Sequence, residues 1–171
     1  MKKLIKKYLI IIFLSLGCTS VSLAKTPNTT SCLQLSGKIL KMKITSSNVY
    51  TVSLISDNTI IETKVIKGNT VFKFNLKKNG WYTVRILKDG YIPRLVSVDT
   101  KLAQEHDGFY KFQFDTELID EHEALKLNKK ALEIPIAHIS FDKKKHWFTH
   151  NVAYTKEVKK KIYCGHVQLN R

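Results

Sequence analysis

Polar and apolar side chains alternate residue by residue along much of this chain, and this alternation restricts its fold more than any other feature. The apolar positions are Phe72, Phe74 and Leu76 in one run and Tyr82, Val84 and Ile86 in another. Successive side chains of a β-strand point to opposite faces of the sheet. A period of two therefore predicts strands with one buried face and excludes an amphipathic helix in these segments.

Six such runs are rich in β-branched and aromatic residues and are separated by turn residues, which is typical of an all-β domain. The expected strands are Gly37–Thr45, Tyr50–Ser56, Thr59–Ile66, Thr70–Leu76, Trp81–Leu87 and Arg94–Val98. Turn pairs such as Asp57-Asn58 and Asn79-Gly80 suit hairpins. Because no helical period separates successive strands, βαβ crossovers have no place, and the sequence predicts a mainly β fold, an antiparallel β-sandwich.

The pattern changes in the last third of the chain. Residues 108–118 form one more long alternating run, whereas residues 120–130 are charged and fit either a short helix or an exposed excursion. Residues 131–141 return to strand character around Pro135, which indicates an edge strand because proline cannot donate to a ladder. Finally, residues at i, i+4 and i+8 predict a short amphipathic helix that docks on the sheet: Tyr154, Val158 and Ile162.

The chain begins like an exported protein. Residues 1–7 carry four lysines and no acid, and residues 8–17 are almost wholly apolar, the pattern of a signal peptide. This run is about half the roughly 20 residues that a membrane-spanning helix needs. Small residues at Ser22 and Ala24 suit a signal peptidase, so the mature chain is expected to start near Lys25, in the periplasm, at the outer membrane or outside the cell.

A lipid anchor is the alternative way out of the cytoplasm. Leu16-Gly17-Cys18 resembles the end of a lipobox, in which the cysteine is acylated, although Ser15 stands where leucine is usual. Acylation of Cys18 would tether the protein to a membrane without spanning it. The expected organisation is thus a signal peptide (1–24), a polar linker (25–34), a β-sandwich domain (35–118) and a C-terminal extension (119–171) packed on the same domain.

The mature chain is basic. The leader holds four of the 29 basic residues and none of the 14 acidic ones, so removing it leaves a net charge of +11. Lysines are scattered and far outnumber arginines, whereas specific recognition of phosphates and bases favours the planar fork of arginine. The sequence therefore argues against nucleic-acid binding and for solvated lysine faces.

Two cysteines remain after cleavage, Cys32 near the mature N-terminus and Cys164 near the C-terminus. An oxidising compartment would allow them to form a disulfide that joins both ends of the domain. The alternative is two unrelated thiols, and their spacing fits neither a zinc nor a redox motif.

One stretch carries a resemblance to a known family. Its pieces are Gly37-Lys38-Ile39, Tyr50–Leu54, Gly68–Leu76, Trp81–Lys88 and Gly90-Tyr91, the last being the most diagnostic. Together, residues 37–99 resemble the carboxypeptidase regulatory-like, or prealbumin-like, domain of bacterial envelope proteins, although Lys67-Gly68-Asn69 replaces the family's acidic-glycine turn. The resemblance implies a prealbumin-like sandwich that serves as a binding or spacer module, with no catalytic residues to transfer.

Candidates for chemistry are few. His146 and His150 would share one face if residues 145–151 were helical, but no glutamate stands between them as the zinc-protease motif requires. The acidic cluster 120–123 suits a solvated segment better than a cation site. No nucleophile motif is present, and the carboxylates of Asp115 and Glu117 share a strand face, which is common. The sequence predicts no cofactor.

Binding is the better hypothesis. Several aromatic residues can form a platform for a sugar or a peptide, with Trp147, Phe148 and Tyr91 as the candidate binding residues. The pair Trp147-Phe148 lies between lysine and histidine residues and is expected to be exposed. We therefore predict a non-enzymatic envelope module that meets a protein or glycan partner, the alternative being a small metal-dependent hydrolase built on histidines and acids.

Overall fold

The computed structural model describes residues 30–40, 49–68, 70–102 and 108–164, and it confirms the expected mainly β, sandwich-like fold. The strands are β1 (Ser31–Ile39), β2 (Val49–Ser56), β3 (Thr59–Lys67), β4 (Phe72–Lys77), β5 (Trp81–Leu87), β6 (Arg94–Asp99), β7 (Tyr110–Thr116), β8 (Ala137–Asp142) and β9 (Trp147–His150). The helices are α2 (Glu121–Ala124), α3 (Lys129–Leu132) and α4 (Val152–Tyr163). The expected signal peptide, Cys18 and residues 41–45 of the first expected strand lie outside the described residues.

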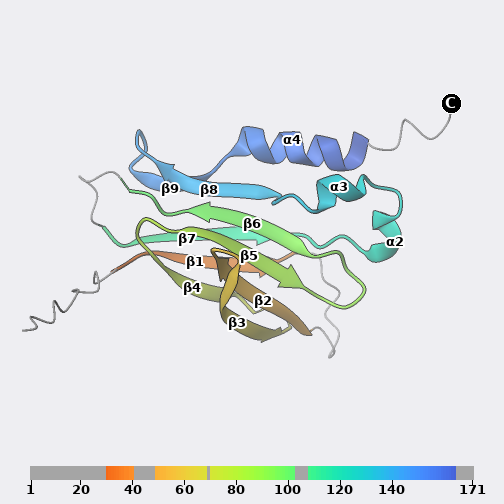
Figure 1. Cartoon of the computed structure of the whole chain (residues 1–171), viewed down its shortest axis with the longest axis horizontal. Helices are drawn as coiled ribbons and strands as arrows, with labels where there is room; N and C mark the ends of the chain where they lie inside the picture. Colours follow the sequence, from red (N-terminus) through yellow and green to blue (C-terminus); the bar gives the residue numbers. More distant parts are fainter. Residues whose placement is uncertain (1–29, 41–48, 69, 103–107, 165–171) are drawn as a thin grey trace, which may run out of the picture.

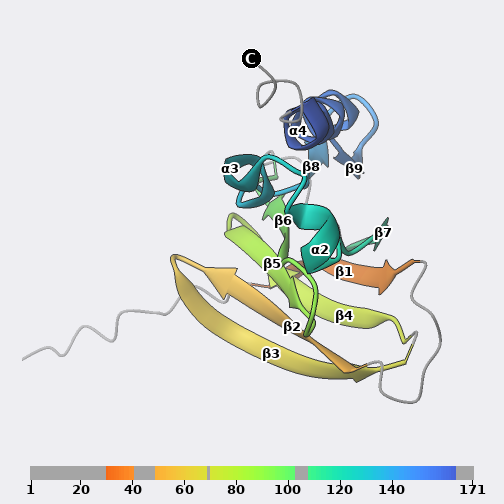
Figure 2. The same cartoon turned by 90° about the vertical axis from the view of Figure 1, so that its right-hand side faces the viewer.

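Two sheets form the sandwich. The larger sheet has the order β3-β2-β5-β6-β8-β9, and the smaller has the order β4-β1-β7. Figure 2 shows the larger sheet rising from β3 at the bottom to β8 beneath α4 at the top, with β1, β4 and β7 on one side of it. Both views place α4 at the end of the molecule opposite β3 (Figures 1 and 2).

The predicted burial of alternate side chains is correct. Phe72, Phe74 and Leu76 are buried in β4 while Lys73 and Asn75 are exposed. In β5, the predicted inner positions of residues 82, 84 and 86 are likewise buried, and all of them belong to one core between the sheets. Turn residues behave as expected, because Asp57, Asn58 and Asn79 have positive φ angles at the hairpin ends.

The prediction of a purely antiparallel sandwich is wrong in two places. β1 pairs in parallel with β7, and β6 pairs in parallel with β8. Parallel neighbours need a long connection, and here whole strands of the opposite sheet supply it, because the chain leaves one sheet and returns much later. Crossover helices are therefore not required.

The polar linker predicted to end at residue 34 is shorter than expected. β1 begins at Ser31, four residues before the predicted onset of order, and both Cys32 and Leu33 are buried. The strand runs between β4 and β7, so its first residues have neighbours on both sides. Residues 31–34 have a weak local preference for β structure, and pairing with the neighbouring strands makes them part of the central strand of the smaller sheet.

The predicted C-terminal extension continues the sandwich instead of merely covering it. The ambiguous segment 120–130 contains the short helix α2 and the start of α3, and β8 then joins the larger sheet beside β6. The edge position inferred from Pro135 is wrong, because the proline precedes β8 and that strand lies between β6 and β9. The predicted amphipathic helix is confirmed as α4, with Val158 and Ile162 buried.

None of the helices formed by the described residues is long and apolar enough to span a membrane.

Candidate functional site

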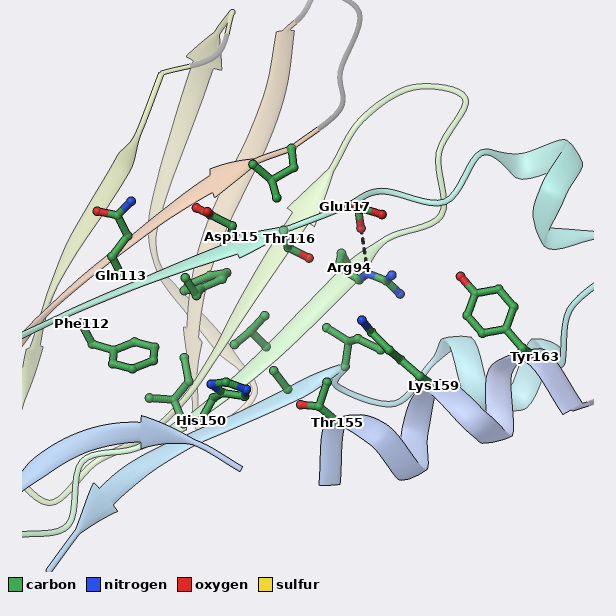
Figure 3. A pocket seen from close by; sticks show the side chains of 16 residues that line it. Arg94, Phe112, Gln113, Asp115, Thr116, Glu117, His150, Thr155, Lys159 and Tyr163 are labelled. Atoms are coloured by element: carbon green, nitrogen blue, oxygen red, sulfur yellow. Dashed lines mark hydrogen bonds between the residues drawn. The ribbon is translucent and has the colours of Figure 1, made fainter. Parts of the chain in front are cut away.

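A cleft of about 500 Å³ opens where the smaller sheet ends, between β7 on one side and β8 and α4 on the other. We call it the β7–α4 cleft (Figure 3). Its volume lies within the range of roughly 300 to 1,000 Å³ that is usual for ligand sites. It exists because the larger sheet extends past β7 through β6 and β8, and no described strand covers that extension.

The apolar side chains of the cleft come from both sheets. Phe112 and Phe114 of β7 are half-buried on one wall, and Val96, Ala137 and Ile139 lie on β6 and β8. The register explains the second group, because Val96 pairs with Ala137 and Val98 with Ile139, which places these side chains on the inner face. The cleft is thus a continuation of the core with one side left open.

Basic and hydroxyl groups gather at the end of the cleft near the last residue of β7. Arg94 Nε donates a hydrogen bond to the backbone oxygen of Glu117 at 3.1 Å. Burial lowers the pKa of Arg94, an effect that Tyr163 and Glu117 oppose, and an arginine remains a cation despite such a shift. The side chain of Lys159 reaches the same end from α4 (Figure 3), so two cations face this part of the cleft.

Helical spacing brings the α4 residues to the cleft. Thr155, Lys159 and Tyr163 stand four residues apart, so they form one stripe along the helix beside the buried stripe. The hydroxyl oxygen of Thr155 is buried and has no hydrogen-bond partner among the described residues. A buried hydroxyl of this kind costs about 1–3 kcal/mol when unpaired, which makes it a notable feature of the wall.

The backbone of β7 offers further groups to the cleft. Leu40 N donates to Thr116 O at 2.8 Å, and the hydroxyl of Ser36 donates to Phe112 O at 3.3 Å, so the even-numbered carbonyls face β1. The carbonyl of Glu117 instead accepts from Arg94 across the cleft. Because N–H and C=O of one strand residue point the same way, the odd-numbered residues 111, 113 and 115 direct theirs away from β1.

The predicted aromatic pair splits between core and surface. Phe148 is fully buried with 0% exposure, whereas Trp147 is 48% exposed, so the prediction that both are exposed is wrong for Phe148. Phe148 packs edge-on against Phe141 and Tyr110, with ring centroids 5.5 and 5.6 Å away. Phe141 lies opposite Phe148 in the β8–β9 hairpin, whereas Tyr110 comes from a distant part of the chain, which the local sequence did not reveal.

Tyr91, the third predicted binding residue, lies apart from the other two. It is half-buried, forms an isolated bridge with Asp120, and its ring is 4.1 Å from the ammonium group of Lys88. Among the other aromatic candidates, Trp81 is 53% exposed and stacks on His138 at 5.3 Å. The structure therefore does not bring the predicted aromatic residues together into one platform.

The two weak metal candidates do not share a helical face. His146 lies in the turn before β9 with a φ of 53°, and His150 is the last residue of that strand and lines the β7–α4 cleft. Asp120 caps α2 by accepting from His122 N at 2.8 Å, which gives the acidic cluster a structural role. Within the described residues, no three histidine, cysteine or acidic side chains are placed to hold a metal.

The predicted disulfide between Cys32 and Cys164 is not formed. Both thiols are free, with Cys32 buried in β1 and Cys164 exposed after α4. Figure 1 shows why: β1 begins at the left of the molecule, whereas α4 ends at the right, beside β8 and at the end of the larger sheet opposite β3. Burial is also the main reason that the pKa of Cys32 is raised.

Sequence reasoning missed Arg94, Thr155 and Lys159. Asp115 and Glu117 were weighed only as an acid pair, and the structure places both at the rim of the cleft. One available signal was the second helical stripe, because residues 155, 159 and 163 repeat the spacing of the predicted stripe one position later. Arg94 gave another signal, as an arginine in a chain whose basic residues are almost all lysines.

Comparisons with known proteins do not assign a function to the β7–α4 cleft. No protein-family model matches the chain, and no curated protein does. A solved structure titled "Crystal Structure of S.CueP" is similar at 14% sequence identity with a TM-score of 0.34. The match covers 52% of this chain and 62% of that chain, so the chain spans less than two thirds of that protein.

Proposed function

We propose that this protein is an exported, non-catalytic binding module that holds a protein partner in the β7–α4 cleft. The observation that carries the proposal is the cleft itself, which joins apolar walls, two cations and outward-facing backbone groups at one open edge of the sandwich. Such a mixture favours recognition by contact and hydrogen bonding. The family resemblance of residues 37–99 agrees with a binding or spacer role, and it stays part of the proposal.

Export follows from the leader and not from the fold. The lysine-rich start, the short apolar run and the small residues Ser22 and Ala24 support cleavage before Lys25, with acylation of Cys18 as the alternative. Mass spectrometry of the protein purified from its native cell distinguishes the two products. A mature protein that still starts at Met1 would contradict export.

In-cell photocrosslinking tests the binding function. A photoreactive amino acid placed at His150, which lines the cleft, should capture a partner that the same group at Val65 does not capture. Val65 is the matched control because it is 64% exposed on β3, at the opposite end of the larger sheet. The captured protein is then purified and its affinity for the whole chain measured by calorimetry.

The expected result is a partner that binds the purified protein and loses affinity when Lys159 is replaced by glutamate. Charge reversal on the cleft wall should weaken this partner at least fivefold, whereas Lys160→Glu, at the next residue of α4 and outside the cleft lining, should leave affinity unchanged. Equal capture at both positions, or no capture at His150, would refute the proposed function.

A glycan is the second candidate partner, and the observation that favours it is Trp81 stacked on His138. An exposed ring of this kind offers the flat apolar surface that suits amphipathic ligands. Titration with cell-wall glycan fragments should quench tryptophan fluorescence in the parent and not in Trp81→Ala, and an unchanged signal in the parent would exclude this partner.

A further inference from the structure

We infer that the partner enters the β7–α4 cleft as an extended peptide, adds a strand to the free edge of β7, and places a carboxylate between Arg94 and Lys159. This inference rests on the proposed function and specifies the ligand of the same site. The proposed ligand is an extended peptide strand. The experiments below distinguish it from a helical segment or a glycan bound in the same cleft.

The first support is the orientation of the β7 backbone. Phe112 O and Thr116 O face β1, so the N–H and C=O groups of Gln113 and Asp115 point to the open side. No described strand pairs with β7 there, because it is the last strand in the order β4-β1-β7. An edge with unpaired donors and acceptors is a template for another strand, which is the basis of β-augmentation.

The second support is the shape of the space beside that edge. Residues 112–117 all line the cleft, a length that matches four or five residues of an added strand at about 3.3 Å per residue. Alternate side chains of such a strand would point at Val96, Ala137 and Ile139. The remaining side chains would face solvent, so the site would select small or β-branched apolar residues at every second position.

The third support is the charge at the end of the cleft. Arg94 and Lys159 reach the cleft where β7 ends, and the Arg94 Nε is already held by Glu117 O. A carboxylate there would meet two cations in a partly buried setting, where ion pairing is stronger than at the surface. Asp115 and Glu117 line the same cleft, and Glu117 already acts on Arg94, so these acids would offset part of that attraction. The carboxylate is either the C-terminus of a strand running parallel to β7 or an aspartate or glutamate side chain.

Thr155 adds a fourth observation. Its buried hydroxyl has no partner among the described residues, and it faces the cleft from α4. A bound peptide offers carbonyl oxygens and N–H groups within a strand's width of that wall. Because this oxygen is almost wholly covered by protein, a peptide would bond to it only after a small local rearrangement of the wall, and such a bond would satisfy the hydroxyl.

The experiment uses the whole mature protein and synthetic octapeptides of random sequence. One library has free C-terminal carboxylates and lacks aspartate and glutamate, a second is amidated but contains acidic residues, and a third is amidated without acids. We expect enrichment from the first or the second library, which identifies the source of the carboxylate, and none from the third. Enrichment only from the third, or from no library, would overturn the inference.

Amide exchange then tests strand addition for the tightest enriched peptide. Its binding should slow exchange of the Gln113 and Asp115 amides at least about tenfold, while the Phe114 amide, which faces β1, should change little. Protection confined to α4 or to the outer face of the larger sheet would overturn the inference.

Paired variants provide the controls. Gln113→Pro removes an outward N–H and should abolish binding, whereas Gln113→Ala keeps that N–H and should retain most of the affinity that the proline variant loses. If the proline variant does not fold, Lys159→Gln serves in its place: it should weaken carboxylate peptides at least fivefold, with Lys160→Gln unchanged. Retained affinity in both Gln113→Pro and Lys159→Gln would contradict the inference.

Thr155→Val separates binding from stability. Removing an unpaired hydroxyl should raise the unfolding temperature of the free protein while lowering peptide affinity about threefold to tenfold. A purely structural role would raise the unfolding temperature and leave peptide affinity unchanged. If His150 captures a partner in cells but no peptide protects Gln113 and Asp115, the inference fails while the proposed function stands; if His150 captures nothing, both fail.

Discussion

Gly37→Ala is the substitution for which the structure gives the clearest magnitude. Gly37 lies near the C-terminal end of β1, paired with Phe72 of β4 on one side and Phe114 of β7 on the other. The two rings meet edge-on over the glycine, with centroids 5.8 Å apart. A side chain at this position therefore competes directly with the ring pair that joins the three strands of the smaller sheet.

The magnitude follows from the contacts that a Cβ atom would make. It would lie 2.3 Å from Phe72 Cζ and 2.9 Å from Phe114 Cζ, both well inside contact distance. Phe72 is almost completely buried, so a shift of its ring would disturb the core side chains packed around it. Overpacking of a core costs about 1–3 kcal/mol, whereas alanine in place of glycine within a strand gains about 0.5–1 kcal/mol. We expect a net loss of about 1–2 kcal/mol in the free energy of unfolding.

Urea denaturation followed by circular dichroism measures this loss as a lower midpoint with an unchanged slope. The control is the double variant Gly37→Ala/Phe72→Leu, because a shorter side chain leaves room for the new methyl group. The two changes should be coupled, so the double variant should lose less stability than the sum of the two single variants. A Gly37→Ala protein as stable as the parent, or additive effects in the double variant, would refute the packing argument.

Three further predictions test other parts of the structure. Phe148→Ala should lower the free energy of unfolding by about 3–5 kcal/mol and Trp147→Ala by no more than about 1.5 kcal/mol, since only the first ring is fully buried; similar losses in urea titrations would contradict this. Native protein should react with a thiol reagent rapidly at Cys164 and only on unfolding at Cys32, whose pKa burial raises, and a peptide map showing equal rates would oppose the assignment. The pKa of Asp142 is lowered by hydrogen bonds from the backbone N–H groups of Lys145 and Lys144 in the β8–β9 turn, so its carboxylate stabilises the fold above about pH 4 and loses this effect as pH falls through the lowered pKa; unfolding midpoints of Asp142→Asn should therefore lie below those of the parent at neutral pH and converge with them in acid.

Local sequence predicted those features that depend on neighbouring residues. The alternation in β4 and β5 placed the buried side chains correctly, because a strand's two faces follow directly from its period of two. The stripe of Val158 and Ile162 likewise predicted α4, which ends at Tyr163. Turn residues such as Asn79 marked the hairpin ends, because positive φ is readily adopted only by a few residue types.

Tertiary structure decided which distant segments meet. Nothing within β1 indicates that it pairs in parallel with β7, because a strand exposes similar hydrogen-bonding groups to any partner of matching register. The same pairing buries Cys32 far from Cys164 and leaves the outer edge of β7 beside α4. Phe148 packs against a ring of the neighbouring strand β8 and a ring of β7, and the contact with β7 is one that its own neighbours in sequence do not specify.

The amino-acid sequence by itself therefore determined the strands, their buried faces and the C-terminal helix. All three follow from the spacing of apolar side chains, which is two residues in a strand and about four in a helix. The β7–α4 cleft depends on two parallel pairings. The pairing of β1 with β7 ends the smaller sheet at β7, and the pairing of β6 with β8 extends the larger sheet beyond it. Its residues come from β6, β7, β8 and α4, and long-range packing is the interaction that brings these elements together.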